Sequence, residues 1–388
     1  MITRFYVDNY KSLVDFTYEP KPMELIVGAN GSGKTTVFEA LEKIKQFAFS
    51  GDEIDEVFDY DQETRWKRSG KRFHEVRFEL TVCHQNDEFK YILVVDLEVL
   101  KVVLQEDLLL NGEPVVESRT QWLNTYPHSS DNPFDNERSA TMKVRGETKT
   151  FPVSSPSQSI LLLSSPEIYR FTSLLSKIHT VSISPNRMSS KIMESNKNEE
   201  ENAEIAVGFR NFASYFARAL QEKPDAVAAV RSSLSSVMDG FSSLSVERSQ
   251  FGDRYLKAIF RSGLAPQEER LSFGLKELSD GQRVLIALYT LLHCAVSADS
   301  TLLIDEPENF IALRELQPWL FEMQDKVEES GGQVLLISHN PEFINQMAPQ
   351  NAVQFTRPNN LETVVGPFKT EGFDGLTPAE VVARGWNQ

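Results

Sequence analysis

The sequence is poor in cysteine and in long apolar runs. Only Cys83 and Cys294 occur among 388 residues, too few for a disulfide framework or a cysteine-based zinc site. Apolar runs reach about 4–6 residues, far short of the ~20 that a membrane-spanning helix needs. Residues 1–5 show no apolar segment of a signal peptide. We therefore expect two buried thiols in a reducing compartment and a cytoplasmic protein.

Positive charge is also scarce, since the net charge is −16. An acidic surface does not attract a nucleic acid without a local basic patch. One such run, Arg65–Arg72, follows an acidic stretch at residues 51–61. Either the two runs pair in a solvated loop, or the basic run holds a phosphate backbone or an acidic partner. Sustained heptads are absent as well, which excludes a long coiled coil.

The most informative stretch present is Gly28–Thr36, which fits the pattern G-x-x-x-x-G-K-[ST]. An apolar segment at residues 23–27 precedes it, and a helical pattern at residues 36–44 follows. Glycines let backbone N–H groups turn toward phosphates, and a helix N-terminus adds positive potential. In this pattern Lys34 reaches the β- and γ-phosphates and the Thr35 hydroxyl contacts Mg²⁺.

Two later segments carry matching chemistry. Residues 278–283 read Leu-Ser-Asp-Gly-Gln-Arg and open an apolar, buried helix, where a Ser-x-Gly turn can bind a second phosphate. Residues 301–308 form a buried strand that ends in Asp305 and Glu306. Ligands bind at the carboxyl ends of parallel strands. Asp305 is suited to Mg²⁺ and Glu306 to polarising the attacking water.

A third segment, residues 333–341, predicts another buried strand that ends at His339. Asn340 and Pro341 suit the cap and first position of a following helix. A histidine at this edge could sense a γ-phosphate, although alone it would be interpreted as structural.

The rest of the chain predicts a mixed α/β organisation. Residues 111–159 look irregular, with short strands that the pattern does not place. A polar link is expected at residues 196–201. The remaining elements are strands at residues 2–7, 13–18, 76–82, 91–97, 181–184 and 255–260, and helical segments at residues 161–175, 205–221 and 226–238.

In their order along the chain these motifs resemble the ABC-type ATPases, specifically the SMC/RecF/OLD-like branch. The resemblance covers residues 1–45, 180–187 and 270–365. It implies an α/β fold, an ABC-type P-loop head whose mixed sheet is flanked by helices, with an inserted, partly helical subdomain. The expected segments are an ATPase lobe at residues 1–110, an insert at 111–265 with a core strand at 180–187, and a second ATPase lobe at 266–388.

The resemblance also implies a site that two copies of the chain complete around ATP and Mg²⁺. Glu306 and His339 would be catalytic, and Thr35 and Asp305 would hold the metal. Glu308 and Asn309 would lie in the dimer-contact loop. The implied nucleotide-binding residues are Asn30, Gly31, Gly33, Lys34, Thr35 and Thr36, with Lys11 and Ser12 nearby, and with Ser279, Gly281 and Gln282 acting from the second copy.

The chain departs from the family pattern in two ways. No Q-loop glutamine can be assigned, and Phe310–Leu313 replaces the usual leucine-histidine-proline segment. The 245 positions between Lys34 and Ser279 are too many for a transporter head, and the 49 residues after His339 are too few for a TOPRIM nuclease.

These features indicate an isolated head with a compact insert. The favoured function is the ATPase and sensor of an anti-phage defence system, a dimeric switch whose nuclease or toxin is a separate protein. The alternative is a RecF- or SMC-like repair ATPase that clamps duplex DNA through Arg65–Arg72. A nucleotide-gated scaffold with negligible hydrolysis is a third interpretation.

Overall fold

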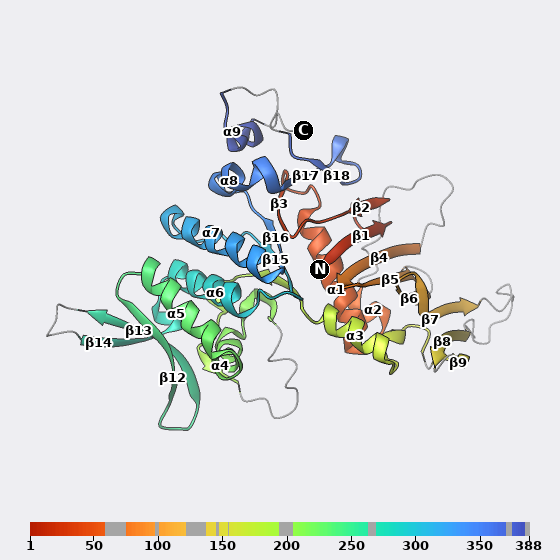
Figure 1. The fold of residues 1–388 in the computed structure, drawn as a ribbon, viewed down its shortest axis with the longest axis horizontal. Helices are drawn as coiled ribbons and strands as arrows, with labels where there is room; N and C mark the ends of the chain where they lie inside the picture. The colour runs from red at the N-terminus through yellow and green to blue at the C-terminus, as the bar shows by residue number, and fades with distance from the viewer. Residues whose placement is uncertain are drawn as a thin grey trace, which may run out of the picture. The chain divides into compact units, whose positions relative to one another are not determined.

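The computed structural model describes residues 1–58, 75–97, 101–121, 137–144, 147–153, 155–193, 205–262, 269–369 and 375–384. These form two compact units that interleave along the sequence (Figure 1). Unit 1 comprises Met1–Lys21, Gly28–Lys177 and Val353–Pro367, and unit 2 comprises Pro22–Val27, Ile178–Ala352 and Phe368–Gln388. Two segments singled out in the sequence lie outside the described residues. They are the basic run Arg65–Arg72 and the expected polar link at residues 196–201.

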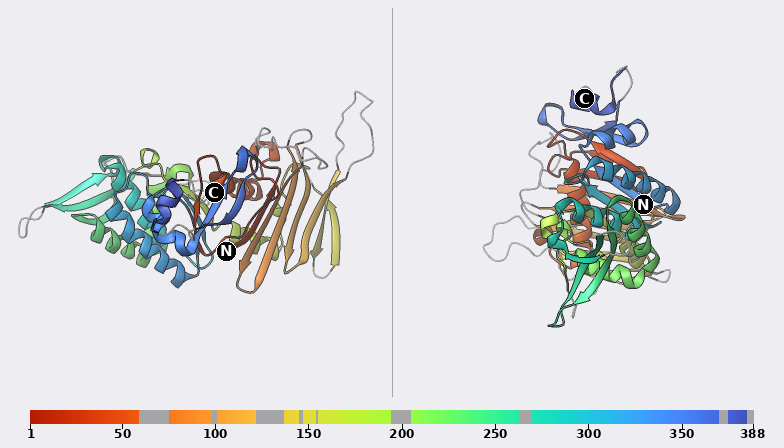
Figure 2. Two further views of the ribbon diagram at one scale, coloured as in Figure 1. Left: turned by 90° about the horizontal axis from the view of Figure 1, so that it is seen from above. Right: turned by 90° about the vertical axis from the view of Figure 1, so that its left-hand side faces the viewer.

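Unit 1 is built on an eight-stranded sheet in which every neighbouring pair is antiparallel, in the order β2-β1-β4-β5-β6-β7-β8-β9. Figure 2 shows its strands side by side. In strand β4 (Glu75–His84), alternate residues from Val76 to Val82 are at most 2% exposed, as expected for a sheet with one covered face. The strands are β1 (Ile2–Asp8), β2 (Phe16–Tyr18), β4 (Glu75–His84), β5 (Asp87–Asp96), β6 (Val102–Leu110), β7 (Glu113–Gln121), β8 (Glu137–Val144) and β9 (Glu147–Pro152).

The helices of unit 1 are α1 (Lys34–Ser50), α2 (Ile54–Val57) and α3 (Pro166–Leu175), with a short 3₁₀ turn, η1 (Ile160–Leu162). Helix α1 contacts α2, α3 and η1. A hairpin of β17 (Ala352–Thr356) and β18 (Val364–Pro367) adds an antiparallel pair. The aromatic rings of Phe16 and Tyr18 both pack on Phe355 of this hairpin.

A buried ion pair joins strands β6 and β8 of unit 1. The Arg138 Nη2 atom lies 2.5 Å from the Glu106 carboxylate, and neither side chain is exposed. The Glu106 carboxylate also accepts hydrogen bonds from the Tyr91 and Ser159 hydroxyls, at 2.8 and 2.6 Å, and from the Ile160 N–H, at 2.9 Å. A buried charge is tolerated when its remaining hydrogen-bonding positions are satisfied in this way. The network ties the turn before α3 to the sheet.

Residues 113–152 hold the three strands that the sequence pattern did not place. Their alternation is hard to recognise because polar side chains also occupy buried positions, as Ser118 and Arg138 do. Val116, Ala140 and Met142 supply the buried apolar side chains. The described parts of this segment are therefore strands rather than irregular chain.

Unit 2 contains four parallel strands in the order β10-β15-β16-β3. Strands β15 (Thr301–Asp305), β16 (Gln333–Ile337) and β3 (Met23–Val27) confirm the predicted buried strands. Strand β10 (Ile178–Ser182) is only partly buried and lies earlier than the core strand expected at residues 180–187, because Pro185–Arg187 form a 3₁₀ turn. All five residues of β3 and of β16 are buried, as parallel strands with two covered faces require. The helices are α4 (Phe212–Glu222), α5 (Pro224–Val237), α6 (Asp280–Cys294), α7 (Leu313–Ser330), α8 (Pro341–Asn351) and α9 (Pro378–Ala383).

A second sheet of unit 2 is antiparallel and centred on β13 (Arg254–Ser262). Strand β12 (Phe241–Arg248) lies on one side of β13, while β11 (Lys191–Ile192) and β14 (Glu269–Gly274) pair with different parts of its other side. Helix α5 contacts both β12 and α6.

Two expectations from the sequence are wrong in detail. Residues 205–221 do not form one helix: Gly208 takes a left-handed φ of 67°, which interrupts the chain, and α4 begins only at Phe212. Val207 and Leu220 are exposed. Cys294 is buried, but Cys83 is partly exposed near the carboxyl end of β4. Among the described residues, no helix combines the length and apolar character that crossing a bilayer requires.

His293 in α6 makes the stability of unit 2 depend on pH. Burial, aided by the charge of Lys326, lowers the pKa of His293 from 6.5 to about 4. Its ring lies 2.9 Å from the Ser233 hydroxyl and 3.6 Å from the Glu322 carboxylate. Between these two pKa values the unfolded chain binds the proton and the folded chain does not. Stability is therefore full above pH 6.5 and is lost as the pH falls toward 4.

We expect the unfolding free energy to drop by about 1 kcal/mol more in the unsubstituted protein than in His293→Gln between pH 7 and pH 5. Urea denaturation at both pH values measures this difference. Equal pH dependence in the two proteins would contradict the assignment.

Candidate functional site

The loop Gly28–Lys34 has the conformation of a phosphate cradle. Gly33 precedes α1 with a φ of 98°, a left-handed conformation that favours glycine. The Lys34 ammonium lies 2.8 Å from the Gly28 carbonyl and 3.0 Å from the Ala29 carbonyl. The Ser32 hydroxyl is buried and, among the described residues, has no hydrogen-bond partner. A loop that encloses an unpartnered hydroxyl fits a ligand that supplies oxygen atoms.

Two glycines of the loop leave no room for a side chain. A Cβ atom at Gly28 would collide with the Phe355 carbonyl oxygen, and one at Gly33 would collide with the Thr363 hydroxyl. In the described part of the chain no side chain caps the N-terminus of α1. The start of α1 therefore remains open to a phosphate, which helix N-termini favour.

The far side of the loop is supported by residues that the sequence analysis did not identify. The Thr363 hydroxyl lies 2.8 Å from the Ser12 hydroxyl and 3.0 Å from the Ser32 carbonyl oxygen. The Arg357 guanidinium donates to the Gly31 carbonyl at 3.0 Å. The partners are 326 to 351 residues apart in sequence, so no local pattern could have shown these contacts.

The structure places Ser12 beside the loop but fixes Lys11 to another partner. The Lys11 ammonium lies 2.6 and 2.7 Å from the two Glu39 carboxylate oxygens, and the Tyr10 hydroxyl donates to the same carboxylate. Glu39 belongs to α1. Lys11 thus secures the N-terminal segment to this helix, and its role toward a nucleotide stays a prediction.

Asp305 and Glu306 stand at the carboxyl end of β15. The Glu306 N–H donates to the Ile337 carbonyl at 2.8 Å, so the pairing with β16 continues past the strand. Glu306 itself takes a φ of 49°, a strained value for a residue other than glycine. Its exposed carboxylate accepts a hydrogen bond from the Asn309 amide at 2.9 Å. Backbone strain of this kind is often stored at functional sites.

Glu308 connects the end of β15 with the turn that carries His339. One carboxylate oxygen accepts from the Ser338 hydroxyl at 2.6 Å, the His339 N–H at 3.0 Å and the Asn340 N–H at 3.2 Å. Asn340 caps α8 through a hydrogen bond from the Glu342 N–H, as predicted. His339 is exposed, and Glu308 holds its backbone. The family resemblance implies a dimer contact for Glu308, and no local pattern in the sequence indicates this internal role.

Ser279 and Gln282 form a reciprocal cap at the start of α6. The Ser279 hydroxyl accepts from the Gln282 N–H at 3.2 Å, and the Gln282 side chain accepts from the Ser279 N–H at 3.0 Å. A Cβ atom at Gly281 would lie 2.6 Å from the Phe310 carbonyl oxygen. Arg283 pairs with Asp280 and donates to the Pro185 carbonyl at 2.8 Å. Residues 278–283, which we call the signature segment, thus pack against the loop that follows β15.

A family model described as "AAA domain, putative AbiEii toxin, Type IV TA system" matches residues 25–345. The chain belongs to this family. The match of this AAA-domain family spans the phosphate loop, the signature segment and the His339 turn. A search of curated protein sequences gives no match.

Solved structures similar to this AAA-domain chain are SMC heads. The structure titled "Crystal structure of the SmcHead bound to the C-winged helix domain of ScpA" superposes with a TM-score of 0.53 at 11% identity, covering 94% of this chain and 98% of that one. The SMC head domain from Thermotoga maritima has a TM-score of 0.47 at 13% identity, covering 95% and 99%. The first match confirms the ABC-type ATPase head fold expected from the motifs.

Gly281→Ala tests the contact between the signature segment and the Phe310 carbonyl. Alanine is favoured over glycine inside a helix by about 1 kcal/mol, so propensity alone predicts stabilisation. The 2.6 Å approach to the backbone oxygen of Phe310 predicts a net loss of about 1–3 kcal/mol instead. Urea denaturation of the variant determines the sign.

Gly366→Ala is the control, because nothing lies within 4 Å of a Cβ atom there. A Gly281→Ala protein as stable as the unsubstituted one would show that α6 and the Phe310 segment are not in firm contact.

Proposed function

We propose that this chain binds ATP with Mg²⁺ and hydrolyses it. The geometry of the phosphate loop carries the proposal: Gly33 is left-handed at the start of α1, and the buried Ser32 hydroxyl has no partner among the described residues. Membership of the AAA-domain family supports the same function.

In this proposal the residues of the chain take separate roles. Lys34 exchanges the carbonyls of Gly28 and Ala29 for phosphate oxygens. The Thr35 hydroxyl and the Asp305 carboxylate are oxygen donors of the type that Mg²⁺ prefers. The bound ion would neutralise charge on the phosphates. The remaining nucleotide contacts are proposed for Asn30, Gly31 and Thr36.

The Glu306 carboxylate is proposed to orient the attacking water. It is exposed at a strand end, and Asn309 directs one of its oxygens. His339, exposed and held through its backbone by Glu308, is proposed to contact the γ-phosphate. The backbone N–H of Glu306 is bound to the Ile337 carbonyl and that of His339 to the Glu308 carboxylate, which limits the freedom lost when the two groups are positioned.

We also propose that a second copy completes the site with Ser279, Gly281 and Gln282. Ser279 is exposed at the N-terminus of α6, where backbone N–H groups favour an anion. Closure of the dimer would then depend on ATP and would gate a separate effector protein in anti-phage defence, docked through the insert at residues 111–265. The ScpA domain bound to the similar SMC head supports a protein partner.

The hydrolysis proposal predicts distinct defects for Lys34→Ala and Glu306→Gln. Lys34→Ala should weaken ATP binding at least about 100-fold, because hydrogen bonds to charged groups contribute about 1.5–3 kcal/mol each. Glu306→Gln should bind ATP normally and lower kcat roughly 10²–10⁴-fold. Calorimetric titration and phosphate release measure the two quantities.

Glu329→Gln, which changes an exposed carboxylate near the end of α7, serves as the control. Unchanged turnover in Glu306→Gln would contradict the assignment of this residue.

Stimulation of ATP hydrolysis by duplex DNA, with a steep salt dependence, would favour the DNA-clamp function over the defence-sensor function.

The dimer proposal is tested with Ser279→Arg in the slowly hydrolysing Glu306→Gln protein. ATP should shift Glu306→Gln from monomer to dimer in light-scattering mass measurements. The added Ser279→Arg should leave ATP affinity intact and prevent the shift, because the long side chain occupies the place of the phosphate. A dimer that persists in Ser279→Arg would contradict closure through this segment.

A further inference from the structure

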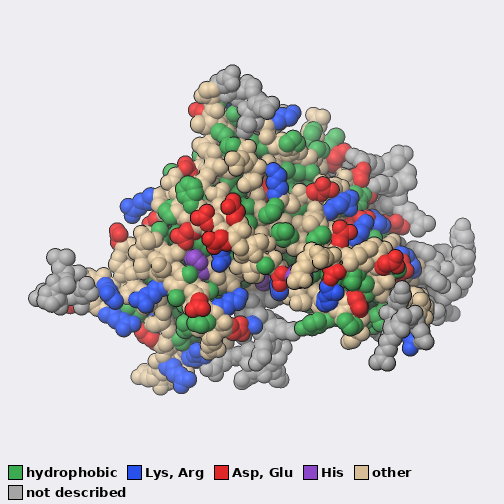
Figure 3. All heavy atoms as spheres, viewed as in Figure 1, with side chains coloured by type: hydrophobic (Ala, Val, Ile, Leu, Met, Phe, Trp, Pro, Cys, Tyr) green, Lys and Arg blue, Asp and Glu red, His purple; other side chains and the backbone are tan. Residues whose placement is uncertain are grey.

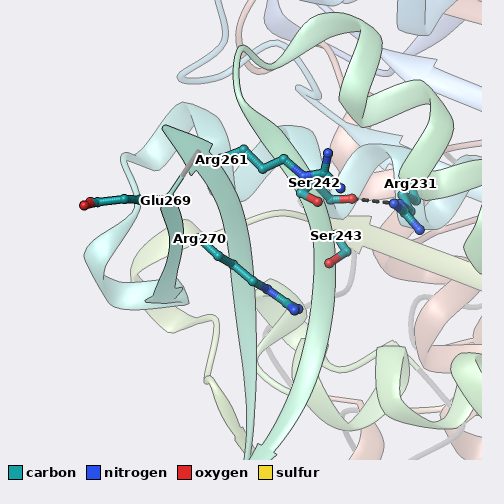
Figure 4. A pocket seen from close by; sticks show the side chains of 6 residues that line it. All are labelled: Arg231, Ser242, Ser243, Arg261, Glu269 and Arg270. Carbon is teal, nitrogen blue, oxygen red and sulfur yellow. Dashed lines mark hydrogen bonds between the residues drawn. The ribbon is translucent and has the colours of Figure 1, made fainter. Parts of the chain in front are cut away.

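The antiparallel sheet of unit 2 carries a basic cleft that none of the motif residues lines. The cleft has a volume of about 280 Å³ and draws its lining from α5, β12, β13 and β14 (Figure 4). Its lining residues are Arg231, Ser242, Ser243, Arg261, Glu269 and Arg270. Three guanidinium groups and two hydroxyls therefore surround one small volume in a chain whose net charge is −16.

The side chains that line the cleft are arranged with the positive groups inward. Figure 4 shows the guanidinium groups of Arg231 and Arg261 on either side of Ser242, and Arg270 reaching toward Ser243. The side chain of Glu269 extends in the opposite direction. The single acidic residue of the cleft thus does not neutralise its interior.

The backbone places two of these arginines where their charges repel. Arg261 on β13 is the direct cross-strand partner of Arg270 on β14. Like charges in directly opposite positions destabilise an antiparallel pair. Within the described part of the chain, neither Arg231 nor Arg270 takes part in an ion pair. An anion bound between the two guanidinium groups would offset this repulsion.

The serines are placed by an irregularity in the neighbouring strand. The register between β12 and β13 shifts between Phe241 and Ser243, and such bulges redirect side chains. The Ser242 carbonyl accepts a hydrogen bond from Arg231 Nε at 2.7 Å, which orients that guanidinium. The cleft is thus shaped by backbone contacts as well as by charge.

We propose that this cleft binds a phosphoryl group. Guanidinium forks match phosphate oxygens in geometry and charge, and serine hydroxyls add hydrogen bonds. The phosphoryl group belongs either to a small phosphorylated molecule or to a nucleic-acid backbone, since the two share this chemistry. The cleft is independent of the proposed ATP site, so neither proposal depends on the other.

The test uses the full chain carrying Lys34→Ala, so that the phosphate loop does not report the binding. Inorganic phosphate, a mononucleotide and a fluorescent single-stranded 12-mer are titrated at constant ionic strength. Arg270→Gln and Arg231→Gln should each weaken binding at least tenfold. In phosphate-free buffer Arg270→Gln should also be as stable as its parent or more stable, because the cross-strand repulsion is removed.

Arg248→Gln is the matched control, since Arg248 also faces an arginine, Arg254, across β12 and β13 but does not line the cleft. Loss of binding confined to the cleft variants supports the proposal. Saturation by phosphate or the mononucleotide then identifies a small ligand, and binding of the 12-mer alone identifies a nucleic-acid backbone. An absence of binding by all three probes, or an equal loss in Arg248→Gln, overturns it.

Discussion

The parallel pairing of β15 with β16 is the constraint on which the arrangement of unit 2 depends. It continues beyond Asp305, because the Glu306 N–H still donates to the Ile337 carbonyl. The strand ends just before Glu306, whose backbone has a left-handed φ. Two residues later, the Glu308 carboxylate accepts hydrogen bonds from the turn after β16. The three donors at one carboxylate oxygen hold the two strand ends together. The backbones of Glu306 and His339 therefore cannot move independently.

The phosphate loop depends on contacts that reach far along the chain. Gly28 and Gly33 permit the close approach of Phe355 and Thr363, and any side chain at either glycine would displace them. Arg357 and Thr363 contact the carbonyl oxygens of Gly31 and Ser32, and the Ser32 N–H donates to the Ala29 carbonyl. The loop is thus shaped before a ligand arrives, and little conformational entropy remains to be lost on binding.

Short apolar runs predicted β3, β15 and β16 correctly. A parallel strand that is covered on both faces is apolar at nearly every position, so a continuous apolar run indicates it directly. The cap at Asn340 was predicted because its chemistry is local. Contacts between distant residues were not predictable: Thr363 beside Ser32, Arg138 beside Glu106 and Gly281 beside the Phe310 carbonyl have no local signal. The helix expected over residues 205–221 failed because one glycine at a left-handed φ overrode a favourable apolar pattern.

The segment between β15 and α7 connects three groups to which the family resemblance assigns separate roles. Glu306 stands at its start, Glu308 holds the His339 turn, and the Phe310 carbonyl packs on Gly281 beside the Ser279 cap. Capping does not prevent Ser279 from contacting a phosphate. Its hydroxyl accepts one hydrogen bond from Gln282, and a serine hydroxyl still has its own proton to donate. A displacement of Glu306 can therefore reach His339 through one carboxylate and Ser279 through one backbone contact, without unfolding any helix.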